Sequence, residues 1–245
     1  PDDNSINIFT IQDDKNLGIQ VRNEILSNPA EYPLLDSVQY KPAYDYLRSI
    51  VSTILNGNKV FYKDEFEWTT YIIRDDQTLN AFCVPGGYIF VYTGLIKYLD
   101  AEDQLAGVLG HEIAHADRRH STDQMTKQYG IETLLGILLG ENQGQLATIA
   151  ANVVLLKYSR DAEREADKYG VSYLCPTIYN ADASSIFFEK LLQDGSVSEE
   201  NSFFSTHPSP DERVQSIRNE KNSLGCAGTS SNDAAYQNFK NNLIP

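Results

Sequence analysis

The chain of 245 residues is 41% hydrophobic, which is enough apolar material for the core of one large domain or two small ones. Its 34 acidic and 20 basic residues give a formal net charge of -14, without a lysine- or arginine-rich run. This charge argues against nucleic acid or an anionic membrane as the main partner. The apolar runs are far shorter than the ~18 residues of a spanning helix, so no transmembrane segment is expected.

The chain begins with Pro1, and its single methionine is Met125. We therefore expect upstream residues to have been removed, such as a signal peptide or a lipid-attachment segment. Residues 1–14 are polar and acidic, which predicts a loosely held N-terminal arm. Apolar residues at helical spacing then predict helices over 17–29 and 42–55.

Segments 67–76 and 81–94 are rich in aromatic and β-branched residues and contain Asp-Asp and Pro-Gly-Gly, which predicts strands joined by turns. From Ala101 onward the sequence predicts mostly helices, over 101–120, 122–139, 145–174, 181–193 and 209–222. Residues 223–245 form a loop-like tail with a short helix predicted over 233–241. The predicted fold is α+β: a mainly helical single domain over 15–222 with a small β-sheet, flanked by the arm and the tail.

The three cysteines are too few for a disulfide scaffold. Cys175 and Cys226 both flank predicted helices in the C-terminal third, so one bridge between them is a reasonable hypothesis, with Cys83 left free. Three reduced cysteines are an equally favoured alternative. A bridge would indicate an oxidising compartment such as the bacterial periplasm.

The segment HEIAH, residues 111–115, has the spacing of a metal site. On a helix, His111 and His115 lie one turn apart and only ~40° off the same line, so both rings can meet one ion. Glu112 lies ~100° around from His111, which suits a base that acts on a water at that ion. The alternative is an ordinary polar helix segment, but in a chain of this composition the motif arises by chance less than about once in a hundred.

A catalytic zinc usually has three protein ligands and one open position for water. The best candidate for the third ligand lies in SRDAEREADKYG, residues 159–170, where Glu163 and Asp167 share a helix face. Glu163 can bind the metal while Asp167 accepts a hydrogen bond from the free ring nitrogen of a histidine ligand. A solvated charged helix is the alternative, and the presence of HEIAH in the same chain favours the metal site.

The two remaining histidines receive different predictions. His207 lies in a loop just before the helix predicted over 209–222. It could donate to the oxyanion of a tetrahedral intermediate or occupy the fourth metal position in a resting form, and a plain surface histidine is about as well supported. His120 would lie ~140° away from His115 on a continuous helix, so it is not expected to be a ligand.

Four segments resemble, in order and spacing, the zinc metallopeptidase family that includes HtpX, BepA and the CAAX prenyl proteases. They are NAFCVPGGYIFVYTGLI (80–96), LAGVLGHEIAHADRRH (105–120), YSRDAEREADKYG (158–170) and STHPSPDERV (205–214). The resemblance spans roughly residues 5–222 and implies a gluzincin with a zincin-like fold and one Zn2+ per chain. It implies zinc ligands at His111, His115 and Glu163, a general base at Glu112, a partner of a ligand histidine at Asp167, and further family positions at His207 and Arg213.

We expect a substrate to lie extended along an edge strand beside the site, which suits unfolded or damaged polypeptides. Here that strand would lie near 80–84 or 87–91. The substrate-binding candidates are Asn80, Ala81, Phe82, Gly87, Tyr88 and Arg213. The apolar region 131–156 is expected to form core helices, with a lid over the site as the alternative.

The function predicted from the residues and the resemblance is a zinc-dependent endopeptidase acting on unfolded or damaged cell-envelope proteins. The lack of membrane helices is similar to periplasmic, often lipid-anchored, bacterial members, so a periplasmic protein or lipoprotein is expected. A zinc-containing, chaperone-like binding protein is the main alternative, although such a protein would have no use for Glu112. Zinc-dependent hydrolysis of a non-peptide bond is disfavoured by the strands beside the site.

Overall fold

The computed structural model describes residues 6–138, 148, 152–194, 203–207 and 212–245. In chain order, its elements are α1 (Ile11–Ser27), α2 (Lys41–Leu55), β1 (Thr69–Ile73), β2 (Ala81–Val84), β3 (Tyr88–Tyr92), α3 (Thr93–Tyr98), α4 (Glu102–Asp117), α5 (His120–Tyr129), α6 (Ile131–Leu138), the 3-10 turn η1 (Val153–Leu155), α8 (Arg160–Leu174), α9 (Ala183–Asp194), the 3-10 turn η3 (Phe203–Ser205), α10 (Arg213–Leu224), α11 (Asp233–Asn238) and the π-helical turn η4 (Phe239–Leu243). The predicted mainly helical α+β fold is confirmed.

The described strands form one three-stranded sheet in the order β1-β3-β2. The central strand β3 runs parallel to β1 and antiparallel to β2, with Ala81 opposite Val91. Between β2 and β3, Gly86 and Gly87 have φ of 78° and 88°, a backbone conformation that glycine adopts without strain. Among the described strands, β2 therefore has a free edge, whereas β3 is paired on both sides.

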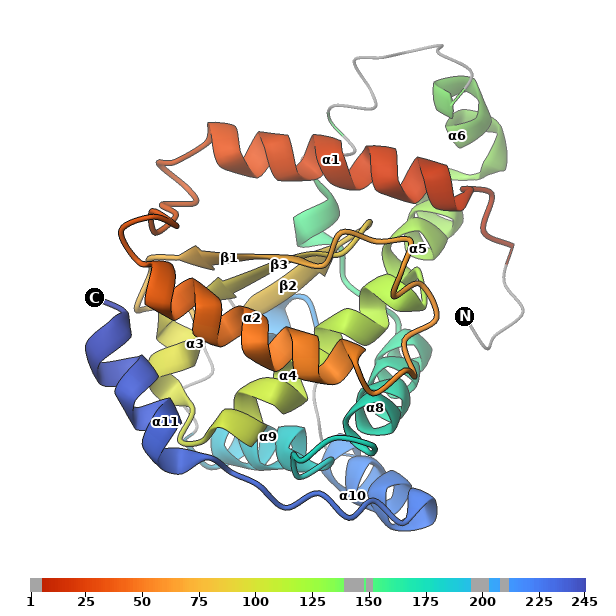
Figure 1. Cartoon of the computed structure of the whole chain (residues 1–245). Helices are drawn as coiled ribbons and strands as arrows, with labels where there is room; N and C mark the ends of the chain where they lie inside the picture. The colour runs from red at the N-terminus through yellow and green to blue at the C-terminus, as the bar shows by residue number, and fades with distance from the viewer. Residues whose placement is uncertain (1–5, 139–147, 149–151, 195–202, 208–211) are drawn as a thin grey trace.

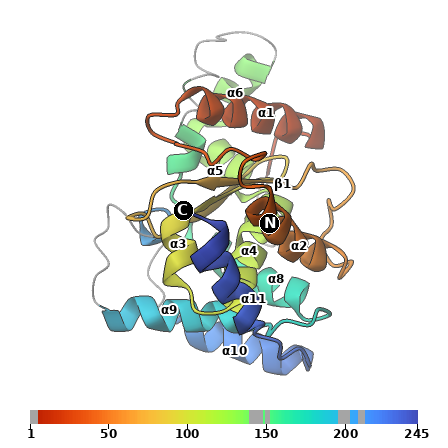
Figure 2. The ribbon, with the colours of Figure 1, turned by 60° about the vertical axis from the view of Figure 1, so that its left-hand side comes forward.

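The sheet lies between α1 on one face and α2 and α4 on the other (Figure 1). Because side chains alternate along a strand, Phe82 and Val84 of β2 pack in the cluster with α1, while Ala81 and Cys83 pack in the larger cluster with α2 and α4. A turned view shows α1 and α6 above the sheet and α9 and α10 below it (Figure 2). The edge strand β2 therefore runs between two apolar clusters.

Helix α4 runs through the middle of the larger cluster, and every one of its residues is buried. Glycines let its neighbours approach closely. A Cβ on Gly107 would lie 2.5 Å from the backbone nitrogen of Ser184 in α9, and one on Gly170 of α8 would lie 3.2 Å from the backbone nitrogen of His111. The two helices that carry HEIAH and Glu163 thus meet almost backbone to backbone.

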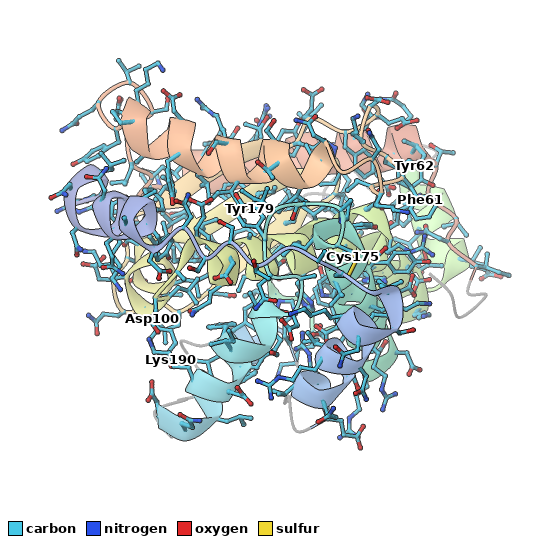
Figure 3. All side chains as sticks on the ribbon, turned by 60° about the horizontal axis from the view of Figure 1, so that its bottom comes forward. Phe61, Tyr62, Asp100, Cys175, Tyr179 and Lys190 are labelled. Carbon is cyan, nitrogen blue, oxygen red and sulfur yellow. A yellow bond between two sulfur atoms is a disulfide. The ribbon has the colours of Figure 1, made fainter. Side chains whose placement is uncertain are left out.

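The C-terminal tail returns across the molecule and joins this core. A disulfide connects Cys226 to Cys175, just after α8, as the sequence suggested, and Cys83 is free and buried. Figure 3 shows the tail passing Cys175 and Tyr179. In α11, which follows this stretch of the tail, the side chain of Tyr236 is fully buried, and its hydroxyl donates to the carbonyl of Ile96 (2.7 Å).

Several predicted helices have different ends in the structure. The first helix begins at Ile11, because Thr10 and Asp13 form a capping box, so the end of the predicted arm is helical. The helix expected over 101–120 stops at Asp117, because Arg119 has a left-handed backbone (φ 62°). Residues 152–159 were expected to be helical but form η1 and an extended link, and α8 begins after its N-cap residue, Ser159.

Within the described ranges, none of the helices combines the length and hydropathy needed to cross a bilayer. Part of the region 131–156 and the start of the helix expected over 209–222 lie outside the described residues.

Candidate metal centre

Four buried side chains each bring one donor atom to a common point next to β2: His111, His115, Glu163 and His207. The Nε2 atoms of His111 and His115 lie 3.0 Å apart. Glu163 Oε1 lies 3.4 Å from His115 Nε2 and 2.8 Å from His207 Nδ1. The two histidines of HEIAH come from one face of α4, Glu163 comes from α8, and His207 follows η3.

The donor set fits a tetrahedral metal ion. Nitrogen and carboxylate ligands bind zinc at about 2.0–2.1 Å, so neighbouring donors lie roughly 3.3 Å apart around the ion. Five donor separations lie between 2.8 Å and 3.5 Å, and all four donor atoms lie within 4.8 Å of one another. Three imidazole nitrogens and one carboxylate oxygen are also the donor types that zinc prefers.

Electrostatics keeps two of these groups in the forms that bind a metal. Burial lowers the pKa of His115 well below its ordinary value, which leaves the ring neutral. Burial works the other way on Glu163, but neighbouring cationic side chains outweigh it and hold the pKa of this carboxyl well below its usual range. At His111, hydrogen bonds to Asp167 and Glu163 outweigh burial and raise the pKa to about 9, so metal binding there must release a proton.

Glu112 lies between the donor cluster and the sheet edge. Its Oε2 accepts a hydrogen bond from the backbone N–H of Cys83 in β2 (3.2 Å). Its Oε1 is buried without a hydrogen-bond partner among the described residues, 3.5 Å from His207 Nε2. Burial raises the pKa of this carboxyl. The carboxylate therefore connects the edge strand to the donor cluster and keeps one oxygen free.

Asp167 lies behind His111, where the sequence placed a partner for a ligand histidine. Its Oδ1 is 3.0 Å from His111 Nδ1, the ring nitrogen that faces away from the other donors. Arg213 of α10 donates to both oxygens of Asp167, from Nε (2.6 Å) and Nη2 (2.7 Å). Arg213 is buried in these contacts with site carboxylates, so the structure favours a role in fixing Asp167 over the substrate contact expected from the sequence.

The free edge of β2 presents the backbone of Ala81 and Cys83. In the antiparallel register, Phe82 and Val84 bond to β3, so the groups of Ala81 and Cys83 point away from the sheet. The Ala81 N–H is bonded to the side-chain oxygen of Asn80 (2.9 Å). The prediction that 87–91 could be the substrate strand is wrong, because β3, which includes Tyr88, is already paired with a strand on each side. The backbone of Gly87 is also bonded, to Val84 through its N–H and to Thr69 of β1 through its carbonyl.

A segment of the chain covers this edge. Val153 and Leu156 pack with Phe82 and Val84 in the cluster on the α1 side. A cavity of only about 10 Å³ remains between this segment, β2, Tyr158 and His207, which is about the space of one water molecule. The Tyr158 N–H donates to the carbonyl of Thr206 (3.2 Å), which ties the segment to the turn that carries His207.

Sequence reasoning missed His120 as a neighbour of the site. Because α4 ends at Asp117 and Arg119 adopts a left-handed conformation, the chain turns back and α5 begins with His120 against His115. Their Nδ1 atoms lie 2.9 Å apart. The prediction that His120 is not among the converging donors agrees with the cluster described above, but the continuous helix behind that prediction was wrong.

Comparison with known proteins agrees with this geometry. A profile of peptidase family M48 matches residues 43–221, nearly three quarters of the chain. The chain belongs to peptidase family M48. The matched range includes α4, α8 and His207, so the whole donor cluster lies inside the M48 region.

Individual M48 relatives are similar at a comparable level. The chain is 32% identical over 182 residues to the mitochondrial metalloendopeptidase OMA1 of Schizosaccharomyces pombe, covering 73% of this chain and 53% of that protein. It is 33% identical over 165 residues to a putative beta-barrel assembly-enhancing protease of Vibrio cholerae, covering 62% and 34%. The metalloprotease YcaL of Escherichia coli is 32% identical over 172 residues, covering 67% and 63%. The chain thus spans about half of the first relative and a third of the second.

Proposed function

We propose that the chain is a zinc-dependent endopeptidase that hydrolyses peptide bonds in unfolded or damaged polypeptides of the cell envelope. The hydrogen bond between the Cys83 N–H and Glu112 carries this proposal. It joins the edge strand to a buried carboxylate whose other oxygen lies 3.5 Å from His207 in the donor cluster. A strand edge binds the backbone of an extended peptide with little regard to its sequence, which suits unfolded substrates.

In this proposal His111, His115 and Glu163 hold the zinc ion and Glu112 is the general base. When bound, zinc would polarise the substrate carbonyl and lower the pKa of a water molecule in the site. Glu112 Oε1, which has no hydrogen-bond partner among the described residues, accepts a proton from that water as the water oxygen attacks the carbonyl carbon. The same carboxyl then gives the proton to the leaving amine nitrogen as the C–N bond breaks.

We assign His207 as a fourth donor in the closed arrangement described here. Its Nδ1 lies 2.8 Å from Glu163 Oε1 and 3.4 Å from His111 Nε2, so it takes the position that water needs. Moving His207 away would open that position and leave its ring near the developing oxyanion, where it can donate a hydrogen bond. Asp167 and Arg213 act as positioning residues for His111.

Substrate access requires the segment over β2 to move. A substrate strand would pair with Ala81 and Cys83, whose N–H groups would have to leave Asn80 Oδ1 and Glu112 Oε2. Val153 and Leu156 lie beside this edge and pack against Phe82 and Val84. Burying two aliphatic side chains of this size stabilises the closed form by about 3 kcal/mol or more. This supports the interpretation of residues 153–156 as part of a lid, and the enzyme is then latent until a substrate or partner displaces it.

The proposed location is the bacterial cell envelope, as a periplasmic protein or lipoprotein. The Cys175–Cys226 disulfide supports an oxidising compartment. The similarity to a beta-barrel assembly-enhancing protease points to the same compartment, and the proposed substrates are polypeptides of that compartment.

Metal analysis combined with cleavage of casein, an unfolded protein, tests this function. We expect about one zinc ion per chain in both the wild type and Glu112→Gln. Cleavage should fall by about 10²- to 10⁴-fold in the variant, because the base is lost while the ligands remain. Zinc binding without cleavage, even after the lid is loosened by Leu156→Ser, would instead favour a chaperone-like binding protein.

A further inference from the structure

His120 contacts the outer face of one proposed metal ligand. Its side chain is 1% exposed, its ring centroid lies 4.9 Å from that of His115, and the two Nδ1 atoms are 2.9 Å apart. This contact forms because the helix ends at Asp117 and the chain turns at Arg119 before α5 begins. The turn is held by the guanidinium of Arg119, which pairs with Asp14 and donates to the carbonyl of Phe9. His120 is therefore held in place from the far side by α1.

The two facing nitrogens can share only one proton. His115 Nε2 points to the other donors, 3.0 Å from His111 Nε2, so in a metal-bound ring the proton must be on Nδ1. His120 must then offer a bare Nδ1 as the acceptor and carry its own proton on Nε2. That nitrogen is buried without a hydrogen-bond partner among the described residues, and Oε2 of Glu165 lies 3.6 Å from it; Oε1 of Glu165 accepts a hydrogen bond from Arg118 (2.6 Å). Glu165 thus favours the one tautomer of His120 that can accept from His115.

We propose that His120, oriented by Glu165, is the positioning residue of His115 and fixes the tautomer and direction of this ligand. The inference rests on the proposed metal site. The two ligand histidines then differ: His111 contacts a carboxylate directly at Asp167, whereas His115 contacts a neutral imidazole whose far nitrogen faces a carboxylate at 3.6 Å. Such outer partners typically change metal affinity by about 10- to 100-fold.

Tyr158 completes the support of His115. Its ring stacks on the imidazole at 3.9 Å between centroids and 22° between planes, and its hydroxyl bonds to Ser121 (2.9 Å). Stacking fixes the plane of the His115 ring but leaves it free to be donor or acceptor at Nδ1. The hydrogen bond with His120 is the contact that selects the tautomer.

The test compares zinc affinity, measured by competition with a chromophoric chelator, in the wild-type chain of 245 residues and three variants. His120→Leu keeps the volume but removes the acceptor, and we expect about 10- to 100-fold weaker binding. His120→Asn places an acceptor oxygen near the position of Nδ1 and should bind within about threefold of wild type. Met125→Ala, a buried change in the same helix whose side chain packs in the apolar cluster on the α1 side, should lower the melting temperature of the metal-free protein and leave zinc affinity unchanged.

A second readout follows the proton itself. In the zinc-loaded wild type, NMR should detect a strongly downfield proton on His115 Nδ1, which should persist in His120→Asn and vanish in His120→Leu. If wild type binds no zinc, the proposed function fails as well. If wild type binds zinc and His120→Leu binds it equally well, or if the Leu and Asn variants weaken binding equally, only the inference is refuted.

Discussion

Gly170→Ala is expected to reduce the free energy of zinc binding by more than it reduces the free energy of unfolding of the metal-free protein. The added Cβ would lie 3.2 Å from the backbone nitrogen of His111, a contact that forces α8 away from α4 by a few tenths of an ångström. Glu163 lies two turns earlier on α8 and would move with it, away from the donors on α4. Since metal–ligand distances tolerate only about ±0.2 Å, zinc affinity should fall by roughly 10- to 100-fold.

The stability of the metal-free protein responds to two opposing effects. Alanine favours a helix over glycine by about 1 kcal/mol, whereas overpacking costs about 1–3 kcal/mol. The net loss should therefore lie between about zero and 2 kcal/mol. The free energy of unfolding depends on both effects, whereas zinc affinity depends only on the displacement of α8.

The assay combines chelator competition with urea unfolding in the presence of EDTA. Gly130→Ala is the matched control: Gly130 has φ of 78°, so alanine there is strained and should lower stability, while a Cβ at this position touches nothing within 4 Å. Its zinc affinity should equal that of wild type. If Gly170→Ala binds zinc within about twofold of wild type, the close approach of α4 and α8 does not set the donor spacing, and the reasoning is wrong.

Three further outcomes are expected. Replacing Cys175 and Cys226 by serine opens a disulfide with a sequence separation of 51, and urea unfolding should show a loss of up to ~4 kcal/mol. Burial raises the pKa of Asp103 to about 6 from 3.8, so the protonated form stabilises the fold fully below about pH 4, and this stabilisation is lost as the pH rises through 6. Urea unfolding should therefore show Asp103→Asn to be more stable than wild type by about 1 kcal/mol at pH 7.5, a value reduced for partial solvent access. At pH 3.5 the variant and wild type should be equally stable. Leu156→Ser should raise casein cleavage about tenfold by loosening the covered edge, whereas Leu155→Ser, at a side chain 67% exposed, should leave the rate unchanged.

The sequence predicted those parts of the site that depend on local spacing. Two histidines four apart on a helix must share a face, so His111 and His115 could be paired without knowing the fold. The same spacing placed Glu163 and Asp167 together, and the structure brings Glu163 to the histidine pair and Asp167 behind it. The strands were also predicted, because aromatic and β-branched residues mark them.

The parts that were missed depend on contacts between distant segments or on one unusual backbone conformation. A single left-handed residue, Arg119, ends the helix early and brings His120 to His115, and arginine gives no signal for such a turn. The strand order places β3 in the centre although it is last in sequence, which decided against Tyr88 as an edge residue. The cover by Val153 could be given only as the alternative to core helices, because a short apolar run looks the same in a core helix as in a lid.

The docked tail has a consequence for how the domain is delimited. The M48 profile ends at residue 221, yet the side chains of Tyr236 and Phe239 are fully buried in the same core as α2 and α4. The profile match therefore ends before the hydrophobic core does. A chain that ended at residue 221 would lack Tyr236 and Phe239 and would expose the apolar core residues that these two rings cover. Such a chain would be prone to aggregate through the exposed surface, although every residue of the metal centre would still be present.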